Sequence, residues 1–376
     1  MAKADYLIKG GTVIDCYQKI YKTADIAVRD GVIVDADEVQ AAHVIDAEGC
    51  LVTPGLIDFH CHLGYGLTDL GIPGEASAFP SGVTTAVDAG TSGTANYQAF
   101  REMTLRSRLR IKAFLNVCPA GLVTTAYHEN IDPSCFQPSK IIRFLRKYND
   151  QLLGLKVRQS AEIAGNLGLA PLEAALEIAQ QAHCPVAVHT TNPPVPAGEI
   201  ARLLRKDDIY IHVYQGKGET VVRDGKIVPE VLEARRRGVV FDAANGTNHF
   251  SLAVAEACLQ QGFEPDIIST DLTRKSLYIP GKVFSLPFIM AKYLALGMPL
   301  EKIVACTTLQ PAAYLGQAKE LGSLCPGTCA DIAVFRLADH PVTFQDFSGK
   351  SVTGTKLLKT QLTMREGEVV FRQVDF

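Results

Sequence analysis

Several features that mark particular classes of protein are missing from this sequence. It has no stretch of about 18 uncharged apolar residues, so a membrane-spanning helix is not expected. It has no long basic run, and its net charge is −3 with the nine histidines neutral, so nucleic-acid binding has no electrostatic basis. We therefore expect neither a membrane nor a nucleic acid as a partner.

Cysteine pairs that would hold zinc or form a disulfide framework are also missing. The ten cysteines are scattered, and only Cys325 and Cys329 lie close together in the chain. The N-terminal segment MAKADYLIKGGTVID has no secretory signal pattern. A large chain with this cysteine usage is expected in the reducing cytoplasm.

The two ends of the chain share a pattern of short alternating runs separated by glycine turns, which predicts β-hairpins. The predicted turns lie at Gly10-Gly11, Asp30-Gly31 and Glu366-Gly367. Chain termini often lie close together. We therefore predict one small β-sandwich domain, built from residues 1–52 and 320–376, with residues 53–319 inserted as a second domain.

The middle of the chain repeats a different unit, in which an apolar, β-branched run is usually followed by an amphipathic helical segment. The eight runs lie at 55–60, 82–88, 111–118, 152–158, 184–189, 208–213, 238–243 and 266–271. The clearest helical segments lie at 138–150, 171–183, 198–206 and 228–238. This alternation predicts an α/β fold, a (β/α)8 TIM-type barrel. An open doubly wound sheet is the alternative, but its GxGxxG loop after the first strand is not found.

Polar residues gather at the ends of the predicted strands, where barrel enzymes carry their active sites. Five strands supply the set His60, His62, Lys156, His189, His212 and Asp271. His60 and His62 share one face of their strand and Cys61 the other, so the pair can bind one metal ion. An HxH pair alone is a weak signal for a metal site. The alternative is that two polar residues lie where a strand ends.

Lys156 is unusual because burying a cation in an apolar strand is costly. It either pairs with a carboxylate or reaches the rim, or burial lowers its pKa so that the neutral amine reacts with CO2. The resulting carbamate would bridge two metal ions as a glutamate would. Arg158 shares the face of Lys156 and is a candidate for binding an anionic group of the substrate. Its alternative role is a structural ion pair at the rim.

As a set, "PGLIDFHCH", "GLKVR", His189, His212 and "ISTD" resemble the amidohydrolase superfamily, in its dihydroorotase-like binuclear branch. The segment "LGSLCPGTCADIAVF" resembles the return of such chains into their β domain. The resemblance covers essentially the whole chain. It is closest to the amidohydrolase/deacetylase subgroup.

The resemblance implies roles for these residues. His60, His62 and Asp271 would bind a buried metal ion, and His189 and His212 a more exposed one. Carboxylated Lys156 would bridge both, together with a hydroxide that attacks the carbonyl of the substrate. Asp271 would also be the catalytic proton shuttle. The implied cofactors are two divalent ions, with zinc as the expected metal, and a CO2-derived carbamate.

Departures from the family pattern bear on the substrate. The residues after the HxH pair, Leu63-Gly64, lack the arginine typical of dihydroorotases. Thr190-Thr191-Asn192 lack the glutamate typical of the deaminases. The subgroup pattern would place a histidine at Asn245. We therefore predict hydrolysis of an amide or ester of a small, anionic acyl compound, with cyclic-amide hydrolysis, nucleobase deamination and a non-catalytic barrel as alternatives.

Further residues are candidates for contact with the substrate. Tyr214 follows His212 by two and is predicted to share its direction, the alternative being a rim aromatic. Asn245 is assigned to substrate binding with Arg158 and Tyr214. His249 is expected to be a surface-loop histidine, Asn116 and Arg274 are weaker candidates, and Asp88 is expected to support the metal site. A homo-oligomer is the expected assembly.

Overall fold

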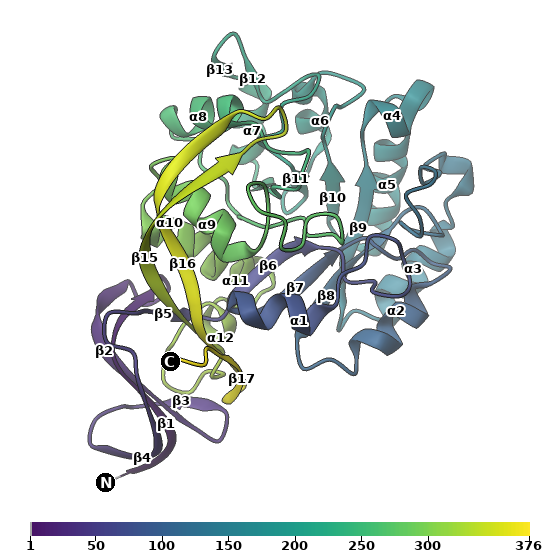
Figure 1. Cartoon of the computed structure of the whole chain (residues 1–376). Coiled ribbons are helices and arrows are strands. Elements are labelled where there is room, and N and C mark those ends of the chain that lie inside the picture. The colour runs from purple at the N-terminus through teal and green to yellow at the C-terminus, as the bar shows by residue number, and fades with distance from the viewer. Residues whose placement is uncertain (1) are drawn as a thin grey trace.

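The computed structural model describes residues 2–376. Figure 1 shows a curled sheet surrounded by helices and, beside it, a sheet in which purple N-terminal strands lie next to yellow C-terminal strands. The α/β barrel with a β domain built from both termini is thus the architecture predicted from the sequence. Within the described residues, no helix has the length and apolarity needed to cross a membrane.

The barrel wall is a parallel sheet whose strands are neighbours in chain order. Its strands are β6 (Leu56–Cys61), β7 (Val83–Ala89), β8 (Arg110–Asn116), β9 (Leu152–Arg158), β10 (Val186–His189), β11 (Ile209–Ile211) and β14 (Val240–Asp242). Most of their residues are buried, which explains why the strands are near-continuous apolar runs in the sequence.

Residues 266–272 close the barrel between β14 and β6 without forming a regular strand. Ile267 makes a bridge to Asp242, and Leu272 makes one to Cys61. The prediction of a regular eighth strand at 266–271 is wrong, although this segment takes the place of that strand. Asp271 has a φ angle of 54°, which interrupts the extended backbone that a continuous ladder needs.

Helices cover the outside of the barrel (Figure 1). The four helical segments predicted from the sequence are confirmed as α3 (Pro138–Lys147), α5 (Ala170–Ala182), α6 (Ala197–Leu203) and α7 (Pro229–Arg236). A proline in the first turn of α3, α5 and α7 has its φ already fixed at a helical value. The other helices are α1 (Gly74–Ala78), α2 (Tyr97–Thr104), α4 (Ala161–Ala164), α8 (Leu252–Gln260), α9 (Leu286–Ala295), α10 (Leu300–Thr307), α11 (Leu309–Tyr314) and α12 (Ala318–Leu321). Short 3-10 turns are η1 (Phe79–Ser81), η2 (Pro133–Cys135) and η3 (Gly165–Leu167).

The terminal strands form one mixed sheet in the order β17-β16-β15-β5-β1-β2-β3, with β4 paired to β1. They are β1 (Ala2–Asp15), β2 (Ile20–Arg29), β3 (Val32–Val34), β4 (Val39–Asp46), β5 (Leu51–Pro54), β15 (Ile332–Gln345), β16 (Ser351–Arg365) and β17 (Glu368–Arg372). Apolar residues from both ends, such as Ile8, Val52 and Ile332, enclose a core of their own. A small separate hairpin joins β12 (Val222–Arg223) to β13 (Lys226–Ile227).

One of the predicted hairpin turns is wrong. Strand β1 runs straight through Gly10-Gly11, and its ladder with β2 shifts register between Ile8 and Gly11. A Cβ on Gly11 would lie 2.5 Å from a methyl carbon of Val52, so glycine permits the close approach of β5. The two glycines therefore mark a β-bulge. The turns predicted at Asp30-Gly31 and Glu366-Gly367 are confirmed.

Candidate metal centre

The structure brings the six predicted metal-binding side chains together at one end of the barrel. All six are buried. Five of them line a cavity of about 410 Å³, and the sixth, His212, contacts His189 at its wall. His60 and His189 end or nearly end their strands, Lys156 lies within β9, and Asp271 lies in the closing segment.

His60 and His62 converge on the carboxylate of Asp271. Their Nε2 atoms lie 3.4 Å and 3.2 Å from Asp271 Oδ1. Burial raises the pKa of Asp271, but hydrogen bonds from His60 and His62 outweigh burial and hold that pKa well below its usual range. Two imidazole nitrogens and an ionised carboxylate thus share one small volume, a donor set that suits a divalent transition metal.

The ring nitrogens that face away from this centre are held by outer partners. His60 Nδ1 lies 3.4 Å from Asp242 Oδ2, and His62 Nδ1 lies 2.9 Å from Thr91 Oγ1. Asp88 in turn accepts the backbone N–H of Thr91 at 2.7 Å, so it reaches the site through that threonine. Such partners fix the tautomer and orientation of an imidazole ligand.

Sequence reasoning missed two of the buried carboxylates that support the centre. Asp242 ends β14, so inspection of every strand end could have found it. Asp58 lies two residues before His60 and accepts both the N–H and the hydroxyl of Thr270, at 3.0 and 2.6 Å. It therefore holds the closing segment one residue from Asp271.

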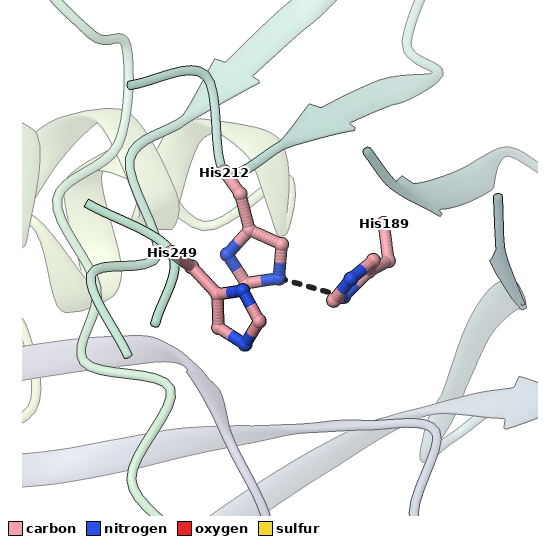
Figure 2. A group of neighbouring side chains, drawn as sticks. All are labelled: His189, His212 and His249. Carbon is pink, nitrogen blue, oxygen red and sulfur yellow. Dashed lines mark hydrogen bonds between the residues drawn. The ribbon is translucent and has the colours of Figure 1, made fainter. Parts of the chain in front are cut away.

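His189 and His212 form a second group of converging nitrogens. Nδ1 of His212 donates to the carbonyl of Ala244 at 2.6 Å, so its Nε2 carries the lone pair. That Nε2 lies 2.9 Å from His189 Nδ1 (Figure 2). Burial and neighbouring positive groups hold the pKa of each ring well below 6.5, so both rings are neutral and able to bind a metal.

Lys156 lines the same cavity as these groups, and its environment fits a bridging role. It is only 2% exposed, and its Nζ has no hydrogen-bond partner among residues 2–376. A Cβ on Gly90, whose φ is 82°, would lie 2.5 Å from Lys156 Cβ. Only glycine at position 90 therefore leaves space for the side chain of Lys156. Burial lowers the pKa of Lys156 to about 8, which increases the neutral fraction of the amine. An orphaned, buried amine beside imidazoles and a carboxylate fits a metal-bridging group better than a structural ion pair.

Comparison with known proteins places the chain among relatives of known family. The model of the Amidohydrolase family matches residues 51–370. A deacetylase of Agrobacterium fabrum (strain C58) is 36% identical over 309 residues, 81% of this chain and 75% of the relative. The chain belongs to the amidohydrolase family. The family resemblance noted in the sequence is thus confirmed, and the protein is a hydrolase of carbon–nitrogen bonds.

Solved structures agree with this assignment. A crystal structure of a dihydroorotase has a TM-score of 0.89 and 30% identity, covering 98% of this chain and 98% of its own. A crystal structure of an adenine deaminase also has a TM-score of 0.89, with 27% identity and coverage of 98% and 100%. Both share the barrel fold of this amidohydrolase.

His249 is part of the site, so the expectation of a surface-loop histidine is wrong. Its ring stacks on His212 with centroids 4.3 Å apart, and its Nε2 lies 3.6 Å from Asp271 Oδ2. Figure 2 shows it beside His189 and His212. The sequence placed His249 in a loop of unknown conformation, and only the fold of that loop brings it to the cavity.

Tyr214 does not lie in the cavity, contrary to the prediction. His212 has a φ of 62°, which ends the strand geometry, so the alternation of faces does not continue to Tyr214. Its hydroxyl donates to the carbonyl of Phe263 at 2.8 Å, and its ring packs against Phe250 and Tyr293. Tyr214 belongs to the apolar core.

Asn245 also lies behind the cavity. Its side-chain amide donates to the Ser269 carbonyl at 3.1 Å, and its oxygen accepts from Lys292 at 3.2 Å. Lys292 lies over the ring of Phe250 at 4.3 Å, and burial lowers its pKa to about 7. Both ends of the amide are engaged, so Asn245 positions the loop that carries His249 and does not face substrate.

Arg158 faces the cavity, where it is already paired. Its Nη1 donates to Glu129 Oε2 at 2.9 Å. The side chain of Glu129 is 2% exposed, and its Oε1 has no partner within the described part of the chain. Glu129 was not anticipated, because the long loop between β8 and α3 gives no periodic signal.

The remaining candidates have structural partners. Asn116 donates to the Gly90 carbonyl and accepts the N–H of Cys118, which shapes the turn after β8. The backbone N–H of Arg274 donates to the Leu70 carbonyl. Neither observation assigns these two residues to substrate.

Proposed function

We propose that this amidohydrolase is a two-metal hydrolase that cleaves the amide or ester bond of a small, anionic acyl compound, as a deacetylase does. The observation that carries this proposal is the convergence of four imidazoles, one buried lysine and one ionised carboxylate at the mouth of the barrel. The deacetylase named among its relatives supports the acyl substrate. Hydrolysis of a cyclic amide is the second candidate, because a structural neighbour is named a dihydroorotase.

The donor set divides into two metal sites. His60, His62 and Asp271 would hold an inner ion, and His189 and His212 an outer one. Lys156, carboxylated by CO2, would supply the anion between them. Zinc is the expected metal because imidazole and carboxylate ligands suit it and it is commonly available.

Metal ions bound here would lower the pKa of water and polarise the carbonyl of the substrate. The protein's own contribution is to hold the groups that move protons. Asp271 Oδ1 faces His60 and His62, whereas Oδ2 faces His249 near the cavity. Asp271 would accept the proton of the attacking water and release it to the leaving nitrogen or oxygen.

Arg158 would bind the anionic group of the substrate. A guanidinium has five N–H donors, and one of them is used by Glu129. Lys217 and Lys275 also line the cavity and, with Arg158, offer positive charge to an anion, although Glu129 and Glu162 share the lining. A small acyl acid fits a cavity of about 410 Å³ with an arginine a short distance from the metal ligands.

The test is the metal content of Lys156→Ala beside wild type, both purified from cells grown with bicarbonate. We expect close to two transition-metal ions per wild-type chain and a sharp loss in the variant, since the variant lacks the proposed bridging carbamate. Lys275→Ala, which removes a lysine from the cavity mouth, is the matched control and should keep wild-type metal content.

Activity is then measured on N-acetyl and O-acetyl derivatives of small carboxylic acids, with dihydroorotate, hydantoin and adenine as competitors. Hydrolysis of the acetyl compounds supports the first candidate, and hydrolysis of the cyclic amides supports the second. Wild-type protein without metal, or with one ion unaffected by Lys156→Ala, would overturn the two-metal proposal.

A further inference from the structure

His249 carries an imidazole into the second group of nitrogens. The nearest ring nitrogens of His189, His212 and His249 all lie within 4.8 Å of one another. Two nitrogens bound to one zinc ion are at most about 4.2 Å apart, because each Zn–N bond is about 2.1 Å. The three rings therefore lie near enough to one another to be candidate ligands of one ion (Figure 2).

The orientation of the His249 ring matches that of a metal ligand. Its Nδ1 lies 2.8 Å from Thr191 Oγ1, which can accept the Nδ1 proton and leave the lone pair on Nε2. That Nε2 faces the ligand cluster, where it lies 3.6 Å from Oδ2 of Asp271. His60, His62 and His212 show the same arrangement, with one nitrogen held by an outer partner and the other facing inward.

The backbone of the loop allows His249 to lie close to Asp271. Gly246 has a φ of 52°, and a Cβ there would lie 2.5 Å from both Asp271 Oδ2 and His249 Cδ2. Any other residue at position 246 would separate His249 from Asp271. Asn245, bonded to Ser269 and Lys292, fixes the loop immediately before this glycine.

We propose that His249 is a third imidazole ligand of the outer metal ion, so that three histidines hold this ion in addition to Lys156. The inference rests on the proposed two-metal function. It adds a ligand from the loop after β14 to the two histidines that the family resemblance implies.

The test counts imidazoles directly. X-ray absorption at the zinc edge of the loaded wild type should show five imidazoles shared by two ions, and His249→Asn should show four. We also expect the second equivalent of metal to bind about 10–100-fold more weakly in His249→Asn. Loss of a hydrogen-bond partner of a ligand already weakens metal binding by this factor, so loss of a ligand should have at least this effect. Gly246→Ala keeps the imidazole of His249 but displaces it. This variant should also lower the imidazole count and weaken binding of the second equivalent of metal.

His128→Asn is the matched control, because His128 lies at the cavity mouth outside the cluster. It should leave the imidazole count and both affinities unchanged. Four imidazoles on two ions in wild type, with no change in His249→Asn, would overturn the inference and leave the two-metal function intact. Fewer than two ions in wild type would overturn both.

Discussion

His212 and Asp271 share an uncommon backbone conformation, with φ angles of 62° and 54°. Non-glycine residues in this left-handed region cost about 1–3 kcal/mol each and cluster at functional sites. The cost is offset by the contacts that the conformation allows, which include the bond from His212 to Ala244 and the contacts of Asp271 with both β6 histidines. Single backbone angles thus decide which side chains face the cavity.

Arg158 and Glu129 form an ion pair in the cavity, and substitution of each partner should change substrate binding in the opposite direction. Arg158→Met should raise the KM for an anionic substrate far more than for its neutral amide, because only the anion loses a charged partner. Glu129→Gln should lower the KM for the anion, since it removes a carboxylate that competes for the same guanidinium. Steady-state kinetics on a matched acid and amide measures both.

A uniform change in KM for the acid and the amide would remove Arg158 from substrate recognition. Glu162→Gln is a suitable control for Glu129, because Glu162 also lines the cavity and is bonded to Asn192 instead.

Among the elements, the closing segment 266–272 depends most on side chains. Isolated bridges join it to β14 and β6, and the pair Asp58–Thr270 adds two hydrogen bonds where a ladder is lacking. Burial raises the pKa of Asp58 to about 7, so the bonds from Thr270 are what stabilise the ionised carboxylate there. The position of Asp271 follows from this pairing.

Thr270→Val should therefore lower the free energy of unfolding by about 1–3 kcal/mol, the cost of leaving a buried acceptor without its donor. The metal content should fall as well, because Asp271 is the next residue. Urea unfolding and elemental analysis measure the two effects. Thr353→Val, at an exposed position of β16, should change neither; equal behaviour of the two variants would contradict the role of the Asp58–Thr270 pair.

For the whole molecule, the two chain ends are tied to the barrel through Asp331. Its carboxylate accepts from Arg110 of β8 at 2.5 Å and from the backbone of Glu366 at 2.8 Å. Its carbonyl accepts the N–H of Gly55, just before β6, at 2.8 Å. The terminal sheet and the strand that carries His60 therefore share one buried anchor.

The pH dependence of the free energy of unfolding is a property of the whole chain, and His249 contributes to it. Burial lowers the pKa of His249 from 6.5 to about 4 in the metal-free protein. As the pH falls below 6.5, the unfolded chain takes up a proton that the folded chain does not, so this contribution to stability is lost. The metal-free wild type should lose about 1–2 kcal/mol relative to His249→Asn between pH 7.5 and pH 5.

Urea unfolding of both proteins with a chelator present measures this difference. The comparison isolates His249, because His60 and Asp58, whose pKa values are raised, titrate in both proteins. Parallel pH curves for the two proteins would show that His249 is not buried as a neutral ring.

The sequence alone determined the barrel, the β domain at the chain ends and the set of six polar residues that gather at one end of the barrel. These follow from local periodicity and chain order, since buried parallel strands are apolar runs and their ends meet at one edge. The pair His60 and His62 could be placed on one side because alternation holds while a strand stays extended.

Only the tertiary structure decided the places of Tyr214, Asn245, His249 and Glu129. Alternation fails after the positive φ of His212, which turns Tyr214 into the core. Asn245 and His249 lie in a loop whose path depends on Gly246 and on Lys292, far away in the chain. Glu129 meets Arg158 across 29 residues. Contacts of this kind depend on backbone angles and long-range packing, which residue spacing does not encode.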